Sequence, residues 1–164
     1  MTRILILLAF LLAPFGLAAP AQAEPADIDA AARGVVRIVI FDRTAEGGEE
    51  ELYPVSHGTG FAVGPQRIVT NAHVVREAMS AGPFGESRVI GIVPPDGDPP
   101  AFARIVAIDP GTDLALLSIQ GSLRMPPLTL AASRPGGSGS EVTSVGYPMN
   151  VDRAQGLSIE DIVR

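Results

Sequence analysis

Short β-branched segments separated by glycine- and proline-rich turns limit the fold of this chain more than any other feature of its sequence. Segments of this kind are typical of the strands in sandwiches and barrels. The intervals between them are too short for the crossover helices that parallel strands require. The sequence therefore predicts an all-β domain, a sandwich or a barrel, with one or two minor helices. The expected strands cover residues 35–41, 60–63, 67–70, 89–93, 101–108, 114–119 and 141–147.

Other segments are expected to form short helices and loops. Residues 27–33 can form one or two helical turns, and residues 73–81 can form a short helix that a following Gly-Pro pair ends. The acidic run over 46–51 is expected as a solvated loop. A calcium site in that run would need a liganding pattern that the run lacks. Residues 136–140 are rich in glycine and serine, so we expect a flexible loop there.

The first 23 residues have the three-part pattern of a secretory signal peptide. Arg3 supplies a positive start, residues 4–12 form an unbroken apolar run, and residues 21–23 form a small-x-small cleavage site. A transmembrane anchor is the alternative, but the apolar run before Pro14 is shorter than the roughly 20 residues that a spanning helix needs. We therefore expect residues 1–23 to be removed on export. The product would be a periplasmic or secreted bacterial protein without a stable membrane anchor.

Cysteine and lysine are both absent, and the formal net charge is −6. Without cysteine the chain can have no disulfide framework, no thiolate metal site and no cysteine nucleophile. An acidic balance argues against nucleic acid as the main partner. No pattern in the sequence implies a metal ion or an organic cofactor. The stability of the domain must therefore rest on core packing or on a ligand.

The chain has only two histidines, and one of them lies in an informative context. His73 follows an expected strand, where the chain turns toward a helix, and Asp113 lies at the start of a later strand. The segments concerned are Gly58-Thr59-Gly60-Phe61-Ala62-Val63, Ile68-Val69-Thr70-Asn71-Ala72-His73-Val74-Val75, Asp109-Pro110-Gly111-Thr112-Asp113-Leu114-Ala115-Leu116-Leu117 and Val145-Gly146-Tyr147-Pro148. In order and approximate spacing, over residues 34 to about 150, they resemble the trypsin-like serine peptidases, particularly the HtrA/Deg-like bacterial branch.

The resemblance implies that His73 is the general base and Asp113 the orienting carboxylate of a Ser-His-Asp triad. A serine hydroxyl must lose its proton as it attacks, and an imidazole can take that proton and return it to the leaving amine. A carboxylate that accepts the other ring N–H fixes the tautomer and stabilises the imidazolium. Taken separately, each residue has a structural reading, His73 as a satisfied surface or core residue and Asp113 as a turn residue or cap.

Neighbouring residues are interpreted as structural. His57 lies before the matched strand, and we expect a loop residue with no catalytic role. Thr59 and Gly60 are expected where a strand packs closely on its neighbours. The core candidates of the same barrel are Phe61, Val63 and Ile68.

The nucleophile of the family lies in a Gly-x-Ser-Gly-Gly segment that has no match in this sequence. Ser158 lacks the following glycines. Ser138 is flanked by glycines, which could expose its hydroxyl beside backbone N–H groups. It lacks the second following glycine, however, and it precedes the Gly-x-Pro strand end instead of following it. We therefore expect no nucleophile in this chain.

The resemblance implies a trypsin-like double Greek-key fold of two β-barrels, the first complete and the second truncated. The expected organisation is a signal peptide over 1–23, a lead-in over 24–33, the first barrel with His73 and Asp113 over 34–120, a linker over 121–140 and the start of an incomplete second barrel over 141–164.

The implied function is that of an exported trypsin-like serine endopeptidase acting on protein or peptide substrates. This chain would be inactive alone because it lacks the nucleophile segment. Two alternatives stay open: a non-catalytic exported binding module that has kept the barrel, and a first barrel that assembles with a separately encoded second half. The sequence leaves the oligomeric state open.

Overall fold

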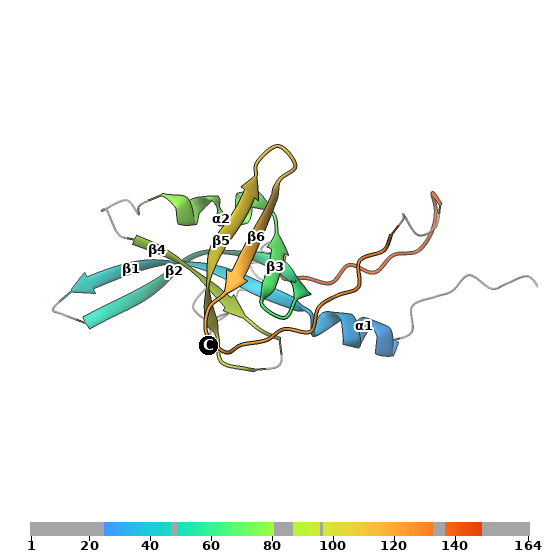
Figure 1. Ribbon diagram of the computed structural model, residues 1–164, viewed down its shortest axis with the longest axis horizontal. Coiled ribbons are helices and arrows are strands. Elements are labelled where there is room, and N and C mark those ends of the chain that lie inside the picture. The colour runs from blue at the N-terminus through green and yellow to red at the C-terminus, as the bar shows by residue number, and fades with distance from the viewer. Residues whose placement is uncertain (1–24, 47–48, 81–86, 96, 133–136, 149–164) are drawn as a thin grey trace, which may run out of the picture.

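The chain folds mainly into β-strands, as the computed structural model shows (Figure 1). The structure describes residues 25–46, 49–80, 87–95, 97–132 and 137–148. The predicted all-β fold class is confirmed, and both predicted short helices are present with slightly shifted bounds. The elements are α1 (Pro25–Ala32), β1 (Val35–Glu46), β2 (Glu49–Gly64), β3 (Arg67–Thr70), α2 (Ala72–Val75), the 3-10 helix η1 (Arg76–Met79), β4 (Ser87–Val93), β5 (Ala101–Asp109) and β6 (Leu114–Ile119).

The strands form one closed antiparallel barrel in the order β1-β2-β3-β6-β5-β4. β1 pairs with β2 along its whole length and with β4 on its other side. Closure removes the unpaired edges that an open sheet would present to solvent. β3 pairs with β6, so that Thr70 lies opposite Ala115. This pairing joins the strand that precedes His73 to the strand that follows Asp113, and it brings both residues to the same end of the barrel.

Aliphatic side chains from every strand fill the barrel interior. Val36, Ile38 and Ile40 alternate along β1, are fully buried and belong to the interior cluster. Val39, on the opposite face of the strand, is fully buried as well. Ile92 and Leu117 reach the same cluster from β4 and β6. Full burial of such a side chain contributes about 1.5–3 kcal/mol. This packing is the main source of stability in a domain without disulfides.

One of the three predicted core residues of β2 and β3 lies in the core. Ile68 is fully buried, whereas Phe61 and Val63 are only half-buried. Successive side chains point to opposite faces of a strand, and the alternation places Gly60 on the inward face. A Cβ at Gly60 would lie 2.7 Å from both Ile38 Cδ1 and Ile68 Cγ2. The close strand packing predicted at Gly60 is therefore present. The prediction that Phe61 and Val63 lie in the core was wrong.

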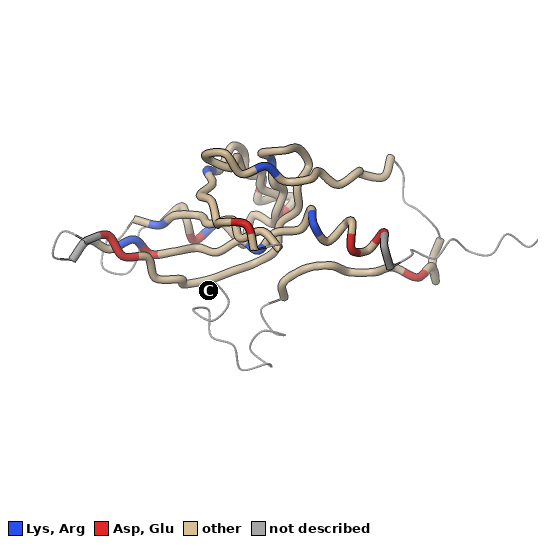
Figure 2. Tube along the Cα trace, turned by 90° about the horizontal axis from the view of Figure 1, so that it is seen from below, with Lys and Arg blue, Asp and Glu red and all other residues tan. Residues whose placement is uncertain are grey.

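The acidic run is part of a long hairpin, so the loop predicted over 46–51 is wrong. β1 continues to Glu46, and β2 begins at Glu49. Figure 2 shows the hairpin projecting from the barrel with acidic segments near its end. Arg43 Nε lies 2.7 Å from Glu50 Oε1 and offsets part of the negative charge. Cross-strand pairing thus overrides the polarity of the segment.

His57 lies within this hairpin, in β2 opposite Val39 of β1, and is 6 % exposed. The prediction of a loop residue is wrong because β2 extends well before the segment that the sequence marks as a strand.

The strand predicted over 141–147 is also wrong, since the described segment 137–148 contains no strand. An extended segment becomes a strand only when its backbone pairs with a neighbour. The segment is held instead by a side chain, because the Tyr147 N–H donates to Thr59 Oγ1 at 2.8 Å. The Arg37 guanidinium also lies 4.6 Å from the centre of the Tyr147 ring.

The predictions for the signal peptide, for Ser158 and for residues 149–164 fall outside the described residues, and the predicted domain bounds stay predictions. In the part of the chain that the structure describes, no helix is long and apolar enough to cross a membrane.

Candidate active site

His73 lies on the exposed side of α2, with 63 % of its side chain exposed. Ala72 and Val75 of the same helix are fully buried against the barrel. Beneath α2, β2 presents Gly58, where a Cβ would lie 2.7 Å from both methyl carbons of Val74. The absence of a side chain at Gly58 lets α2 approach β2 closely, and this contact sets the position of His73 above the barrel.

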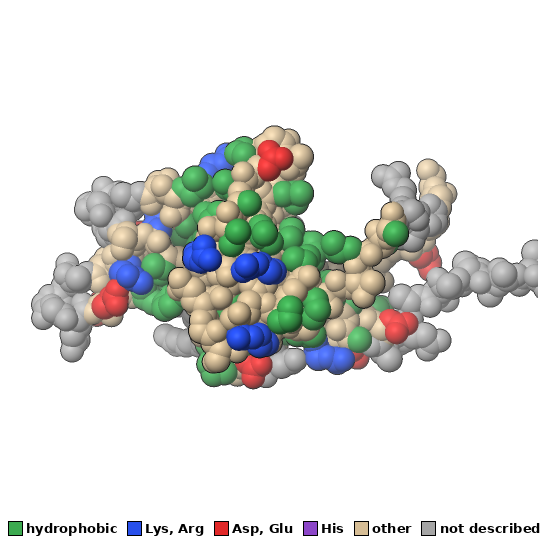
Figure 3. All heavy atoms as spheres, viewed as in Figure 1, with side chains coloured by type: hydrophobic (Ala, Val, Ile, Leu, Met, Phe, Trp, Pro, Cys, Tyr) green, Lys and Arg blue, Asp and Glu red, His purple; other side chains and the backbone are tan. Residues whose placement is uncertain are grey.

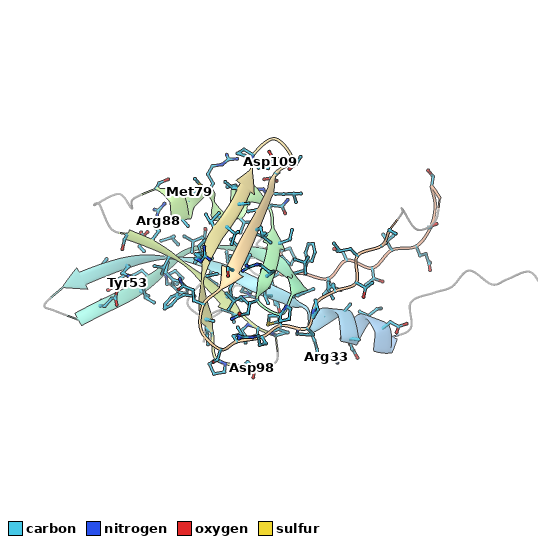
Figure 4. The ribbon with its side chains drawn as sticks, in the orientation of Figure 1. Arg33, Tyr53, Met79, Arg88, Asp98 and Asp109 are labelled. Atoms are coloured by element: carbon cyan, nitrogen blue, oxygen red, sulfur yellow. The ribbon has the colours of Figure 1, made fainter. Side chains whose placement is uncertain are left out.

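Asp113 is the last residue of the turn between β5 and β6. This turn begins after Asp109, which Figure 4 labels. The Asp109 carboxylate accepts the Thr112 hydroxyl at 2.8 Å and the Gly111 N–H at 2.9 Å. These two hydrogen bonds lower the pKa of Asp109. Asp113 then has φ of 55°, in the left-handed region that Asp tolerates better than most residues. From this backbone conformation its side chain reaches α2.

The two predicted site residues are in direct contact. His73 Nδ1 lies 2.7 Å from Asp113 Oδ2, and the backbone N–H of His73 donates to Oδ1 at 2.9 Å. One carboxylate therefore holds both the ring and the backbone of the histidine. Because an ionised carboxylate only accepts hydrogen bonds, the proton of a neutral ring lies on Nδ1, and Nε2 keeps its lone pair. The arrangement leaves Nε2 as the basic atom.

Hydrogen bonding keeps Asp113 in its charged form. The bond from the His73 backbone N–H is the largest cause that lowers the pKa of Asp113, followed by the bond from the ring. Desolvation acts in the opposite direction, and the charge of His73 and a hydrogen bond from Asn71 lower the pKa further. With 42 % of its side chain exposed, the carboxylate can counterbalance a positive imidazolium while remaining ionised.

Asn71 is a site residue that the sequence reasoning missed. Its Nδ2 donates to the backbone oxygen of Asp113 at 3.1 Å and to Oδ2 at 3.2 Å. The available signal was a polar amide just before a short helix. That signal indicates a helix cap, and it gives no indication of a partner 42 residues away.

Ser138 does not join the pair. It belongs to a turn in which the Ser140 N–H donates to Gly137 O at 3.2 Å. Figure 1 draws the start of the 137–148 segment at the far right, well away from α2. Among the described residues, no serine has a hydrogen bond to His73.

Figure 3 shows the face of the molecule that β5 and β6 form, and it carries mainly hydrophobic and arginine side chains. No histidine is visible on this face.

Within the described ranges, no group of three or more His, Cys, Asp or Glu residues could hold a metal ion.

Comparison with known proteins places these observations in a family. A family model described as Trypsin-like peptidase domain matches residues 58–162. The chain is 37 % identical over 94 residues to Serine protease Rv3671c of Mycobacterium tuberculosis, which covers 57 % of this chain and 20 % of that protein. It is 35 % identical over 122 residues to mitochondrial Serine protease HTRA2 of Bos taurus, covering 74 % of this chain and 24 % of that protein.

One further relative is not named as a protease. Anti-sigma-I factor RsgI9 of Acetivibrio thermocellus is 29 % identical over 120 residues, covering 73 % of this chain and 15 % of that protein. The chain spans between 15 % and 24 % of the length of the three relatives. The family match begins at Gly58 and contains both His73 and Asp113. The chain therefore belongs to the trypsin-like peptidase domain family and is homologous to HtrA-type serine proteases.

Proposed function

We propose that this chain supplies the general base and its orienting carboxylate to a serine endopeptidase that hydrolyses proteins or peptides. The observation that carries the proposal is the 2.7 Å contact between His73 Nδ1 and Asp113 Oδ2. The contact lies inside the segment that matches the trypsin-like peptidase domain. Homology to serine proteases supports the reaction class.

In the proposed reaction, His73 Nε2 takes the proton of a serine hydroxyl as the serine oxygen attacks the peptide carbonyl carbon. Asp113 stays ionised and stabilises the resulting imidazolium. His73 then gives the proton to the leaving amine nitrogen as the C–N bond breaks, which leaves an acyl-enzyme. Water attacks the ester in the same way, and the serine hydroxyl is restored.

The proposal also concerns the serine nucleophile of the reaction. The sequence contains no Gly-x-Ser-Gly-Gly segment, so we expect the 164-residue chain alone to hydrolyse no peptide. The serine and the oxyanion-hole N–H groups would be contributed from outside this sequence. Export, through the signal-peptide pattern over 1–23, is part of the same proposal and rests on the sequence alone.

A second candidate function is that of a non-catalytic binding module. The similarity to the anti-sigma-I factor favours it, because 73 % of this chain aligns with a protein whose name denotes no peptidase. The six strands also close into a barrel with its own core, which gives such a module a rigid framework.

The two candidates can be separated by activity. The 164-residue chain and the protein expressed from its complete reading frame are incubated with a serine-directed fluorophosphonate and with casein. The peptidase proposal predicts labelling and hydrolysis only for the second protein. His73→Ala and Asp113→Asn in that protein should lower kcat by about 10⁴-fold, the scale of triad defects. Asp98→Asn, at an exposed aspartate, is the matched control and should leave activity unchanged.

Labelling of the 164-residue chain would contradict the statement about the nucleophile. If the complete protein is neither labelled nor active, the peptidase proposal fails and the binding module is favoured.

A further inference from the structure

The side chain of Asn71 does not cap the helix that it precedes. Asn71 is the N-cap of α2, with extended backbone angles of φ −75° and ψ 144°. Asparagine is among the preferred residues at this position because its side-chain oxygen accepts a hydrogen bond from the first turn. Here it makes no such bond. Its amide instead donates twice to Asp113.

Three consecutive residues hold Asp113 through N–H donors. The Ala72 N–H donates to the Asp113 backbone oxygen at 3.0 Å, and the His73 N–H donates to Oδ1. The Asn71 amide bridges the backbone oxygen and Oδ2. Oδ2 is also the oxygen that accepts from His73 Nδ1. The Asn71 amide therefore ties the backbone of Asp113, at φ 55°, to the carboxylate oxygen that orients the imidazole.

The chemistry of the donor suits this place. A carboxamide N–H is neutral and does not titrate in the working range of a peptidase. It can stabilise a carboxylate without supplying a competing positive charge. An acid at the same place would repel Asp113, and a base would draw the carboxylate away from His73.

We propose that Asn71 is a positioning residue that acts through Asp113 to hold His73 in its Nδ1–H tautomer. The inference rests on the proposed function for its catalytic consequence. Among the causes that lower the pKa of Asp113, the Asn71 bond is the smallest. Removal of the amide should therefore disturb the direction of the carboxylate more than its charge.

Two variants test this in the full 164-residue chain. Asn71→Ser and Asn71→Asp both keep a good N-cap residue, so the start of α2 is preserved. Serine is too short to bridge to Asp113, and aspartate replaces the donor by an acceptor with a like charge. Gln66→Ser is the matched control, because Gln66 Nε2 also donates to a distant backbone oxygen, that of Gly121 at 2.9 Å, at the other end of β3.

The measurement is a long-range ¹H–¹⁵N correlation spectrum of the His73 ring across pH, with folding monitored by circular dichroism. We expect the Nδ1–H tautomer to dominate in the wild type and in Gln66→Ser. In Asn71→Ser the Nε2–H fraction should rise severalfold. In Asn71→Asp the Nε2–H fraction should rise as well, because the new carboxylate repels Asp113 from its place beside the ring.

Unchanged tautomer ratios in both folded variants would overturn the proposal. Loss of cooperative folding in both, with Gln66→Ser intact, would assign Asn71 a purely structural role and would also overturn it. In the protein from the complete reading frame, Asn71→Ser should lower kcat about tenfold with KM unchanged. If the wild type has no peptidase activity, the proposed function fails, and the tautomer measurement still decides the role of Asn71.

Discussion

Replacement of Gly58 by alanine tests how the barrel positions the histidine helix. The added Cβ would lie 2.7 Å from both Cγ1 and Cγ2 of Val74. Ordinary carbon contacts are about 3.5–4.0 Å, so β2 and α2 must separate by roughly an ångström. Overpacking of this kind costs about 1–3 kcal/mol. We expect Gly58→Ala to lower the free energy of unfolding by about 2 kcal/mol, which is a large fraction of a typical domain's stability of about 5–15 kcal/mol.

The assay is urea unfolding of the chain followed by circular dichroism. Gly64→Ala, in the same strand, is the matched control, because its nearest contacts would be Arg67 Cβ at 3.5 Å and Cγ at 3.6 Å. Such ordinary contacts should change stability by less than about 0.5 kcal/mol. Val74→Ala removes both crowded methyl groups, so it should restore about 1–2 kcal/mol in the double variant with Gly58→Ala.

A cost at Gly58 no larger than that at Gly64 would refute the reasoning. So would a double variant whose loss is the plain sum of the single losses, because the clash is then not with Val74.

Further predictions concern the charge at the site, the core and a buried ion pair. The folded-state pKa of Asp113 lies below 3.8, so its ionised form contributes stability above about pH 4 that is lost as pH falls through the lower folded value. Asp113→Asn should remove this part of the acid-induced loss in urea titrations between pH 2 and 6, and an unchanged slope would contradict it. Ile38→Ala, at a fully buried position, should cost about 2–5 kcal/mol in the same assay; a loss below about 1 kcal/mol would count against the described core. Arg88 Nε donates to Asp42 Oδ1 at 2.6 Å, with side chains only 15 % and 14 % exposed, and Nη1 donates to Glu77 O at 3.2 Å. Arg88→Met should therefore cost about 1–3 kcal/mol, and a double-mutant cycle with Asp42→Asn should show coupling, whose absence would exclude the pair as the cause.

Local patterns in the sequence were sufficient for the strands whose pairing is also local. The strands over 60–63 and 67–70 were predicted because they flank a short segment with a glycine and a proline. Long-range pairing was not visible in the same way. The acidic run over 46–51 lies in strands because the end of β1 pairs with the start of β2. His57 is buried in β2 through the same pairing, opposite Val39. Residues 141–147 have strand-forming composition but no described partner strand.

The candidate pair His73 and Asp113 was found through motifs, because each lies in a distinctive local segment. The role of Asn71 was not predictable in this way. Its contacts depend on the β3–β6 pairing and on the left-handed backbone of Asp113. Neither feature has a signature in the residues around Asn71, whose local context indicates a helix cap.

The most direct test of the central claim is the protonation of the His73 ring, observed by long-range ¹H–¹⁵N correlation in the wild type and in Asp113→Asn. The 2.7 Å contact predicts a neutral ring protonated on Nδ1, with a low-field proton signal, and a shift toward the Nε2–H tautomer when Asp113 is replaced. A wild-type ring protonated on Nε2, or a ring unaffected by Asp113→Asn, would contradict the assignment of His73 as a base oriented by Asp113.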